Sequence, residues 1–291
     1  MKFLKKYLVT IILFAVALAG LGLLLYPSFS DWWNRFHQSR VVAAYADKVA
    51  NMNTEEFDAL FESAEAYNEE ITRRGIIWTM TDEERERYLQ ELDVTGTGNM
   101  GYIEIPKIQV MLPIYHGTNE SVLQIATGHI EGSSLPVGGL GTHTIISGHR
   151  GLPSATLFSD LDDLIVGDTF TINVLNRTLT YEVDQIRTVL PYDLSELTID
   201  REKDYCTLVT CTPIGVNTHR ILVRAHRIEN AQGEALVIPD AMQVRPIYIA
   251  PFIAAPVLLI LILIVLFSTG QNSRKKKERE RSIDEEKKRA A

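Results

Sequence analysis

Two long uncharged apolar runs lie near the ends of the chain, and shorter periodic patterns lie between them. Residues 7–26 and 247–268 are each long enough to cross a bilayer as a helix, which requires about 20 residues. Such runs are rare in the cores of soluble domains, so the pattern predicts two transmembrane helices. A small-residue site of the signal-peptide type lies at Ala17–Ala19, but the apolar run continues to Tyr26, which favours an uncleaved anchor.

Between the runs, residues 27–99 form an exterior segment with a helical pattern over residues 38–74. Asn53, with Glu56 three residues later, matches a capping box and marks a helix start. The apolar residues that follow have helical spacing, which predicts a face packed on the domain. These residues are Phe57, Leu60, Phe61, Ala64, Tyr67 and Ile71.

Two smaller features belong to the same segment. A second, shorter helix is expected from Thr81 to Leu92, because acidic residues follow Thr81 directly. Phe29, Trp32 and Trp33 come just after the first apolar run. Aromatic residues at this place suit the membrane interface, although they could equally dock on the domain.

From residue 100 onward the period changes to that of short β-strands. Seven such segments, separated by Gly, Pro, Asn and Asp turns, predict a closed or nearly closed β-barrel over residues 100–230. They are Tyr102–Pro106, Val110–Tyr115, Thr142–Ser147, Thr169–Val174, Leu179–Gln185, Cys206–Thr210 and Arg220–His226. A linker is expected over residues 231–246 and a charged tail over residues 269–291.

Charge sets the expected orientation of the spans. Three lysines lie in residues 1–6, and six basic residues lie between Arg274 and Arg281. Positive flanks mark the cytoplasmic side, so we expect a two-pass protein of the cell membrane with both termini in the cytoplasm and the barrel outside. The part between the flanks has 17 basic and 32 acidic residues. A surface this acidic argues against nucleic acid and suits a basic, lysine-bearing partner.

The two cysteines cannot form a disulfide within the predicted strand. Cys206 and Cys211 are five residues apart, and an odd separation places them on opposite faces of a strand. At about 3.3 Å per residue they would lie roughly 16 Å apart, beyond disulfide reach. Cys206 is therefore expected to be a small buried apolar residue. Cys211 is then a free thiol in an oxidising compartment, which calls for another explanation.

Three residues suggest what that explanation is. Cys211 stands where a strand ends, Arg220 opens the next strand, and His149 follows the strand Thr142–Ser147 in a glycine-bounded turn. A thiolate attacks carbonyl carbons, an imidazole transfers protons, and a guanidinium donates hydrogen bonds to an oxyanion. The combination predicts acyl transfer through a thioester.

Each of these residues also has a plainer interpretation. The thiol could serve packing, the imidazole could belong to a surface turn, and the guanidinium could form an ion pair. His143 has the same strand parity as His149, so spacing does not exclude it. Further histidines compete for the role: His116, His129, His219 and His226. No Cys-x-x-Cys or His-x-x-x-His pair occurs, so no metal site and no cofactor are expected.

Taken in order, these segments resemble the sortases, and among them the class C, pilin-polymerising sortases of Gram-positive bacteria. Thr207–Cys211 is similar to the nucleophile segment, Arg220 to the arginine of the following strand, and Ser147–Gly151 to the histidine segment. Further class C-like stretches are Gly101–Ile108, Leu112–Thr118, Gly128–Gly139 and Thr212–Arg220. The second predicted membrane span is also a feature of class C sortases.

The resemblance implies an eight-stranded sortase β-barrel that cleaves a Leu-Pro-X-Thr-Gly-like sorting signal between Thr and Gly. It implies that the acyl group passes from Cys211 to a lysine amine of another pilin subunit, so that subunits are polymerised. His149 would be the proton donor and acceptor, and Arg220 the oxyanion stabiliser. Two alternatives stay open: a sortase that anchors proteins to a wall-peptide amine, and a non-catalytic membrane-tethered binding barrel.

One departure from the class C pattern concerns the lid. These sortases often carry an Asp-Pro-aromatic tripeptide before the barrel that covers the cysteine, and residues 74–82 contain none. We hypothesise that Ile77 or Trp78 covers the cleft instead. The alternatives are that no lid exists and that Trp78 is a packing aromatic.

Overall fold

A computed structural model gives the fold of residues 2–230, with side-chain surroundings from residue 12 onward. Among the described residues the chain divides into two units at residue 28, and the second unit contains the barrel. The linker, the second membrane span and the charged tail that the sequence predicts lie outside the described residues.

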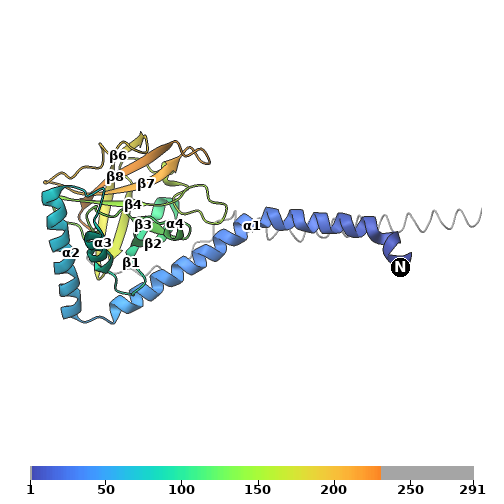
Figure 1. The fold of residues 1–291 in the computed structure, drawn as a ribbon, viewed down its shortest axis with the longest axis horizontal. Coiled ribbons are helices and arrows are strands. Elements are labelled where there is room, and N and C mark those ends of the chain that lie inside the picture. The colour runs from blue at the N-terminus through green and yellow to red at the C-terminus, as the bar shows by residue number, and fades with distance from the viewer. Residues whose placement is uncertain (1, 231–291) are drawn as a thin grey trace, which may run out of the picture. The chain divides into compact units, whose positions relative to one another are not determined.

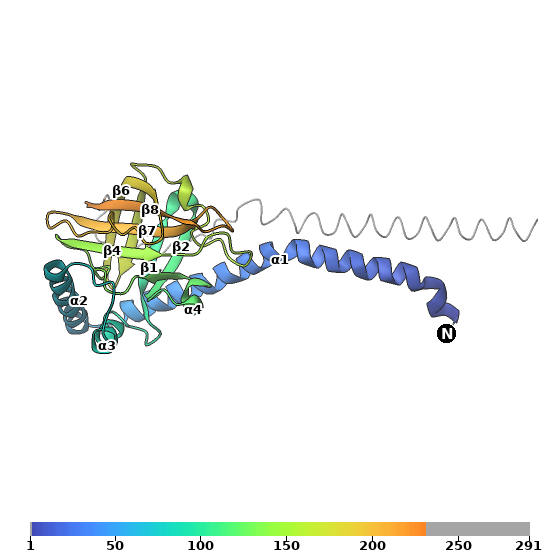
Figure 2. The ribbon, with the colours of Figure 1, turned by 45° about the horizontal axis from the view of Figure 1, so that its top comes forward.

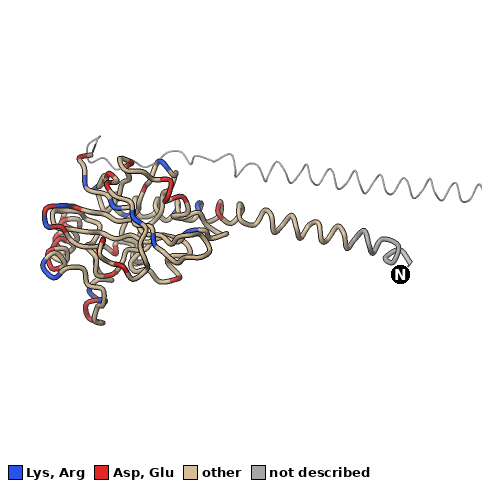
Figure 3. Tube along the Cα trace, turned by 90° about the horizontal axis from the view of Figure 1, so that it is seen from above, with Lys and Arg blue, Asp and Glu red and all other residues tan. Residues whose placement is uncertain are grey.

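The first helix, α1 (Lys2–Ala50), is longer than the sequence pattern predicts. The pattern predicts a span that ends at Tyr26, but the helix continues through Pro27. A proline inside a helix removes one N–H donor and costs about 3 kcal/mol in water, whereas membrane helices tolerate it. Among the described residues, α1 is the one helix long and apolar enough to cross a membrane. Figure 3 shows a long stretch of this helix without charged residues, consistent with a membrane anchor.

Beyond its apolar stretch, α1 carries an aromatic face. Phe29, Trp32, Trp33 and Phe36 are 52%, 42%, 49% and 38% exposed, respectively. Their rings contact one another along the helix, with the Phe29 and Trp32 centroids 5.8 Å apart. This exposure argues against docking of these rings on the barrel, and their position at a membrane interface stays a prediction.

Two further helices begin at the caps that the sequence predicts. The Asn53 side chain accepts from the Glu56 N–H, and the Glu56 carboxylate accepts from the Asn53 N–H, at the start of α2 (Thr54–Arg74). The same reciprocal box opens α3 (Asp82–Gln90) at Thr81. Figures 1 and 2 show both helices beside the barrel, where the apolar face of α2 joins the main core.

Eight strands close into a barrel in the order β1-β2-β3-β4-β7-β8-β6-β5, as expected. Their bounds are β1 Asn99–Ile105, β2 Val110–His116, β3 Thr127–His129, β4 Thr142–Ser147, β5 Thr169–Val174, β6 Arg177–Val189, β7 Asp204–Thr212 and β8 His219–Ile228. Most neighbours are antiparallel, but β2 pairs in parallel with β3, and β4 in parallel with β7. Short helical turns complete the chain: η1 (Pro106–Ile108), α4 (Glu120–Leu123) and η2 (Leu161–Asp163).

The strand that the sequence pattern does not predict is β3. It has only three residues, too few for an alternation to be recognised. Gly128 at its centre permits a close approach of backbones, because a Cβ there would come within 2.1 Å of the Gly117 carbonyl oxygen. A small residue is therefore required where β3 enters the barrel beside β2.

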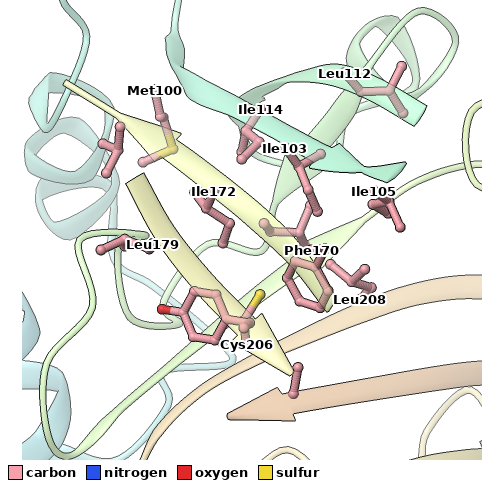
Figure 4. Close-up of a cluster of buried hydrophobic side chains, with 14 of the residues drawn as sticks. Met100, Ile103, Ile105, Leu112, Ile114, Phe170, Ile172, Leu179, Cys206 and Leu208 are labelled. Atoms are coloured by element: carbon pink, nitrogen blue, oxygen red, sulfur yellow. The ribbon is translucent and has the colours of Figure 1, made fainter. Parts of the chain in front are cut away.

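Alternate residues of the strands fill the barrel interior. Figure 4 shows part of this core, which residues from β1, β2, β5, β6 and β7 form together. Cys206 lies within it and is fully buried. Burial raises the pKa of the Cys206 thiol well above its ordinary value, so this cysteine stays protonated and fills space, as the sequence analysis expects.

Candidate active site

The C-terminal ends of β4 and β7 lie side by side, because these strands pair in parallel. The last residue of β4 is opposite Val209, and the pairing continues beyond it. The Gly148 N–H donates to the Val209 carbonyl at 3.0 Å, and the Thr210 hydroxyl donates to the Gly148 carbonyl at 2.8 Å. His149 and Cys211 each follow two residues after the paired residues. The register therefore places residue 149 level with residue 211 along the two strands.

Cys211 belongs to the outer face of the barrel. Side chains alternate along β7, so Cys206 and Leu208 face the interior, while Val209 and Cys211 face outward. On the other side of β7, Cys211 is directly opposite Arg220 of β8. Both cysteines are free, Cys206 buried and Cys211 half-buried, which confirms the predicted separation.

The guanidinium of Arg220 is held by carbonyls at the end of the β7–β8 loop and at the start of β8. Its Nη1 donates to the carbonyls of Asn217 and His219, both at 3.0 Å. His149, Cys211 and Arg220 thus form one row across the ends of three neighbouring strands. The backbone register places all three candidates at neighbouring strand ends, and their catalytic roles stay a prediction.

A carboxylate also approaches the imidazole. Glu120, the first residue of α4, places Oε2 3.5 Å from His149 Nε2. The pKa of the Glu120 carboxyl lies below its ordinary value. The main cause is a hydrogen bond from Gln124, and the second is a hydrogen bond from His149. The Glu120 side chain is 71% exposed, so water screens this contact. Sequence reasoning missed Glu120, because its contact with His149 is visible only in the folded chain.

Two glycines shape the loop that carries His149. A Cβ at Gly148 would come within 2.7 Å of the Phe158 ring, and one at Gly151 within 2.5 Å of the Ile214 side chain. Gly151 also has a φ of +71°, which favours glycine. Because Ile214 belongs to the loop between β7 and β8, the two loops that flank the thiol contact each other here.

The competing histidines have other surroundings. His143 is fully buried; its Nδ1 donates to the Thr198 carbonyl, and the Thr207 hydroxyl donates to its Nε2, both at 2.7 Å. His143 is on the same face as His149 but lies near the start of β4. There it is bonded to the segment that contains Thr198. His129 is also fully buried, with its Nε2 donating to the Ser134 carbonyl at 2.8 Å.

The other three histidines are also occupied elsewhere. Both ring nitrogens of His116 lie within 2.9 Å of backbone carbonyl oxygens. His226 Nδ1 is 3.8 Å from an Asp184 carboxylate oxygen. His219 Nδ1 is 3.0 Å from the Thr218 hydroxyl and lies opposite Thr212 on β7. None of the three belongs to the row of His149, Cys211 and Arg220.

The two residues predicted as a lid have distinct positions. The Ile77 N–H donates to the Gly132 carbonyl at 3.0 Å, and its side chain packs on the main core. Trp78 is 43% exposed. The neighbouring Ile76, for which the sequence pattern predicts no role, packs on an outer-face cluster that includes Val209. Val209, one member of this cluster, is two residues before Cys211 on β7.

The donor set of this site suits acyl transfer by side chains. Within residues 12–230, no group of three or more His, Cys, Asp and Glu side chains has an arrangement that could hold a metal ion. A half-buried thiol, an imidazole with a carboxylate neighbour and a guanidinium fixed by carbonyls can attack a carbonyl, move a proton and bind an oxyanion.

Comparison with known proteins agrees with this chemistry. The sortase domain profile matches residues 103–228. Sortase C1 from Streptococcus agalactiae is 56% identical, with a TM-score of 0.65 over 66% of this chain and 99% of that chain. Sortase C from Streptococcus pneumoniae is 42% identical, with a TM-score of 0.59 over 66% of this chain and 97% of that chain.

A curated relative gives a more distant comparison. Sortase D of Bacillus subtilis is 31% identical over 131 residues, or 44% of this chain and 63% of that protein. The match thus spans less than two thirds of this relative. Together with the solved structures, these similarities show that the chain belongs to the sortase family of cysteine transpeptidases, and that its structural neighbours are class C sortases of Gram-positive bacteria.

His129 and His143 should make the fold less stable in mild acid. Burial lowers the pKa of each imidazole to about 4, whereas the unfolded chain titrates near the ordinary value of 6.5. Between these values the unfolded state binds more protons, so stability falls as the pH falls from about 6.5 to 4. The loss is on the order of 3 kcal/mol per histidine. The thermal unfolding midpoint of the detergent-solubilised chain should decline over this range.

His143→Gln provides the control for this prediction, because an amide keeps a donor for Thr198 and an acceptor for Thr207. The variant should lose less stability than the wild type between pH 6.5 and 4.5. Equal declines in the two proteins would show that His143 does not contribute to the acid sensitivity.

Proposed function

We propose that this protein is a class C sortase that polymerises pilin subunits. It cleaves a Leu-Pro-X-Thr-Gly-like sorting signal between Thr and Gly and joins the new acyl group to a lysine amine of another subunit. The observation that carries the proposal is the row of His149, Cys211 and Arg220 at three strand ends. It occurs in a chain that is 56% identical to a sortase C1.

Each residue of the row has one role in the proposed reaction. The Cys211 thiolate attacks the Thr carbonyl carbon, and Arg220 donates hydrogen bonds to the resulting oxyanion. The His149 imidazolium donates its proton to the departing Gly amine as the C–N bond breaks, which leaves a thioester. The imidazole then accepts a proton from the lysine amine, which attacks the thioester and releases the thiolate.

Two further observations support the class C assignment. The Streptococcus pneumoniae sortase C, described in terms of pilin substrate specificity, is 42% identical to this chain. The part of the chain between the flanking basic segments has 17 basic and 32 acidic residues, which suits an acceptor that carries lysine. In this proposal α1 anchors an extracellular barrel to the cell membrane, and residues 247–268 return the chain to the cytoplasm.

The two cysteines should differ completely in their effect on activity. Cys211→Ala removes the nucleophile and should abolish cleavage of a sorting-signal peptide, while Cys206→Ala leaves the outer face intact and should retain it. Arg220→Lys should lower kcat by about 10²–10³, because one ammonium replaces the fork of donors at the oxyanion. Peptide cleavage by the purified full chain, followed by mass spectrometry, measures all three effects. Cleavage by Cys211→Ala would contradict the proposed role of this thiol.

The acceptor distinguishes pilin polymerisation from wall anchoring. With a sorting-signal peptide and a lysine-bearing pilin domain, the wild type should form an isopeptide-linked product. A wall-peptide amine at the same concentration should give at least tenfold less. Mass spectrometry of the linked products gives the ratio. A preference for the wall-peptide amine would replace pilin polymerisation by anchoring and leave the thioester chemistry unchanged.

We further propose that the segment after α2 limits access to the thiol. Ile76 supports this proposal, because it packs on the outer-face cluster that includes Val209, two residues before Cys211. Ile76→Ala should raise the rate of Cys211 labelling by a thiol reagent severalfold. Ile77→Ala and Trp78→Ala test the two residues that the sequence analysis selects. Unchanged labelling in all three variants would exclude a lid built from this segment.

A further inference from the structure

The barrel-facing side of α1 just beyond its apolar stretch is lined by polar residues. Asp31, Asn34, Arg35 and Gln38 have helical spacing and share one face, whereas the aromatic face lies on the other side of the helix. Asp31 and Gln38 are each only 7% exposed. Burial of polar groups is unfavourable unless they find hydrogen-bond partners, so the contacts of this face show what the helix holds.

Asp31 is bound to the loop that follows β4. Its Oδ1 accepts from the Thr156 N–H at 2.7 Å and from the Thr156 hydroxyl at 2.8 Å. Its Oδ2 accepts from Arg35 Nε at 2.9 Å. One turn further along, Asn34 Nδ2 donates to the Ser154 carbonyl at 2.8 Å. The helix therefore fixes this loop at two neighbouring residues.

The same loop carries His149 at its start. The Phe158 N–H donates to the His149 carbonyl at 3.1 Å, and the Phe158 ring lies against Gly148. Phe158 is fully buried, and the residue before it, Leu157, is 97% buried with a φ of 41°. A tightly packed segment of two residues thus connects Thr156, the partner of Asp31, to the backbone of His149.

Gln38 holds the second element that approaches the imidazole. Its Nε2 donates to the Ile125 carbonyl at 2.7 Å, just after α4. Figures 1 and 2 show α4 beside α1. The first residue of α4 is Glu120, whose carboxylate lies 3.5 Å from His149 Nε2. Helix α1 therefore fixes both the loop that carries His149 and the short helix that carries Glu120.

We propose that Asp31 is a positioning residue for His149, and that Asn34 and Gln38 assist it. This face of α1 holds the imidazole where it can transfer a proton to the leaving and attacking amines. The membrane-proximal part of the anchor helix thereby becomes part of the catalytic apparatus. The inference rests on the proposed function, since it assigns to His149 a proton-transfer role.

Asp31→Ala in the full-length chain tests the proposal with peptide cleavage as the assay. A displaced imidazole slows proton transfer but leaves the peptide site intact, so kcat should fall at least tenfold while KM stays within twofold. Asp31→Asn keeps the Oδ1 acceptor for Thr156 and should recover most of the lost kcat. Thr156→Val removes only the hydroxyl and should lower kcat in the same direction; it serves as a second variant if Asp31→Ala does not fold.

Tyr45→Phe is the matched control on the same helix. The Tyr45 hydroxyl donates to the Met100 carbonyl at 2.9 Å and accepts from the Leu175 N–H at 2.8 Å, so it docks α1 on the barrel through β1 and the β5–β6 turn. Its loss should lower the thermal unfolding midpoint and leave kcat within twofold of the wild type.

Two results would overturn the positioning role. One is a kcat within twofold of the wild type in both Asp31→Ala and Thr156→Val. The other is an equal loss of kcat in Tyr45→Phe, which would mean that any weakening of helix docking has the same effect. Failure of the wild type itself to cleave the peptide would instead overturn the proposed function.

Discussion

The parallel pairing of β4 with β7 is the constraint on which the whole site depends. It aligns two strand ends, and the hydrogen bonds of Gly148 with Val209 and Thr210 extend the alignment past the end of β4. The antiparallel partner of β7 then supplies Arg220 opposite Cys211. Backbone hydrogen bonds thus place these three residues in one row on a rigid support, and the contacts of α1 with the loop of His149 add to it.

The alternation of side chains along β7 separates chemistry from packing within one strand. Cys206 faces the core, where its thiol stays protonated, and Cys211 faces outward and is half-buried. A similar division of labour applies to α1 beyond its apolar stretch. One face binds the loop of His149, and the opposite face exposes aromatic rings. In the strand, alternate side chains face the core and the outer surface. In the helix, the 3.6-residue period separates a face that binds the barrel from a face that exposes aromatic rings.

The sequence was sufficient for most of the barrel, because the alternation of apolar residues and turn residues is strong in long strands. It failed for β3, which is too short to alternate, and for the continuity of α1, because Pro27 normally interrupts a helix in water. Parity alone could not separate His143 from His149, whereas the structure shows that His143 is fully buried and bonded to the Thr198 carbonyl. Glu120 and Asp31 were missed for the same reason: their partners are distant in sequence and no local pattern reveals such contacts.

The same β4–β7 pair also governs when the site can form during folding. Gly148 and Thr210 are 62 residues apart, so their pairing closes a long loop at a large cost in conformational entropy. Folds rich in contacts of such sequence separation form slowly, and β8, the last of the described strands, must still add Arg220. α1 and the N-terminal helices leave the synthesis machinery long before that. A growing chain therefore holds its anchor well before it can hold an assembled row of His149, Cys211 and Arg220.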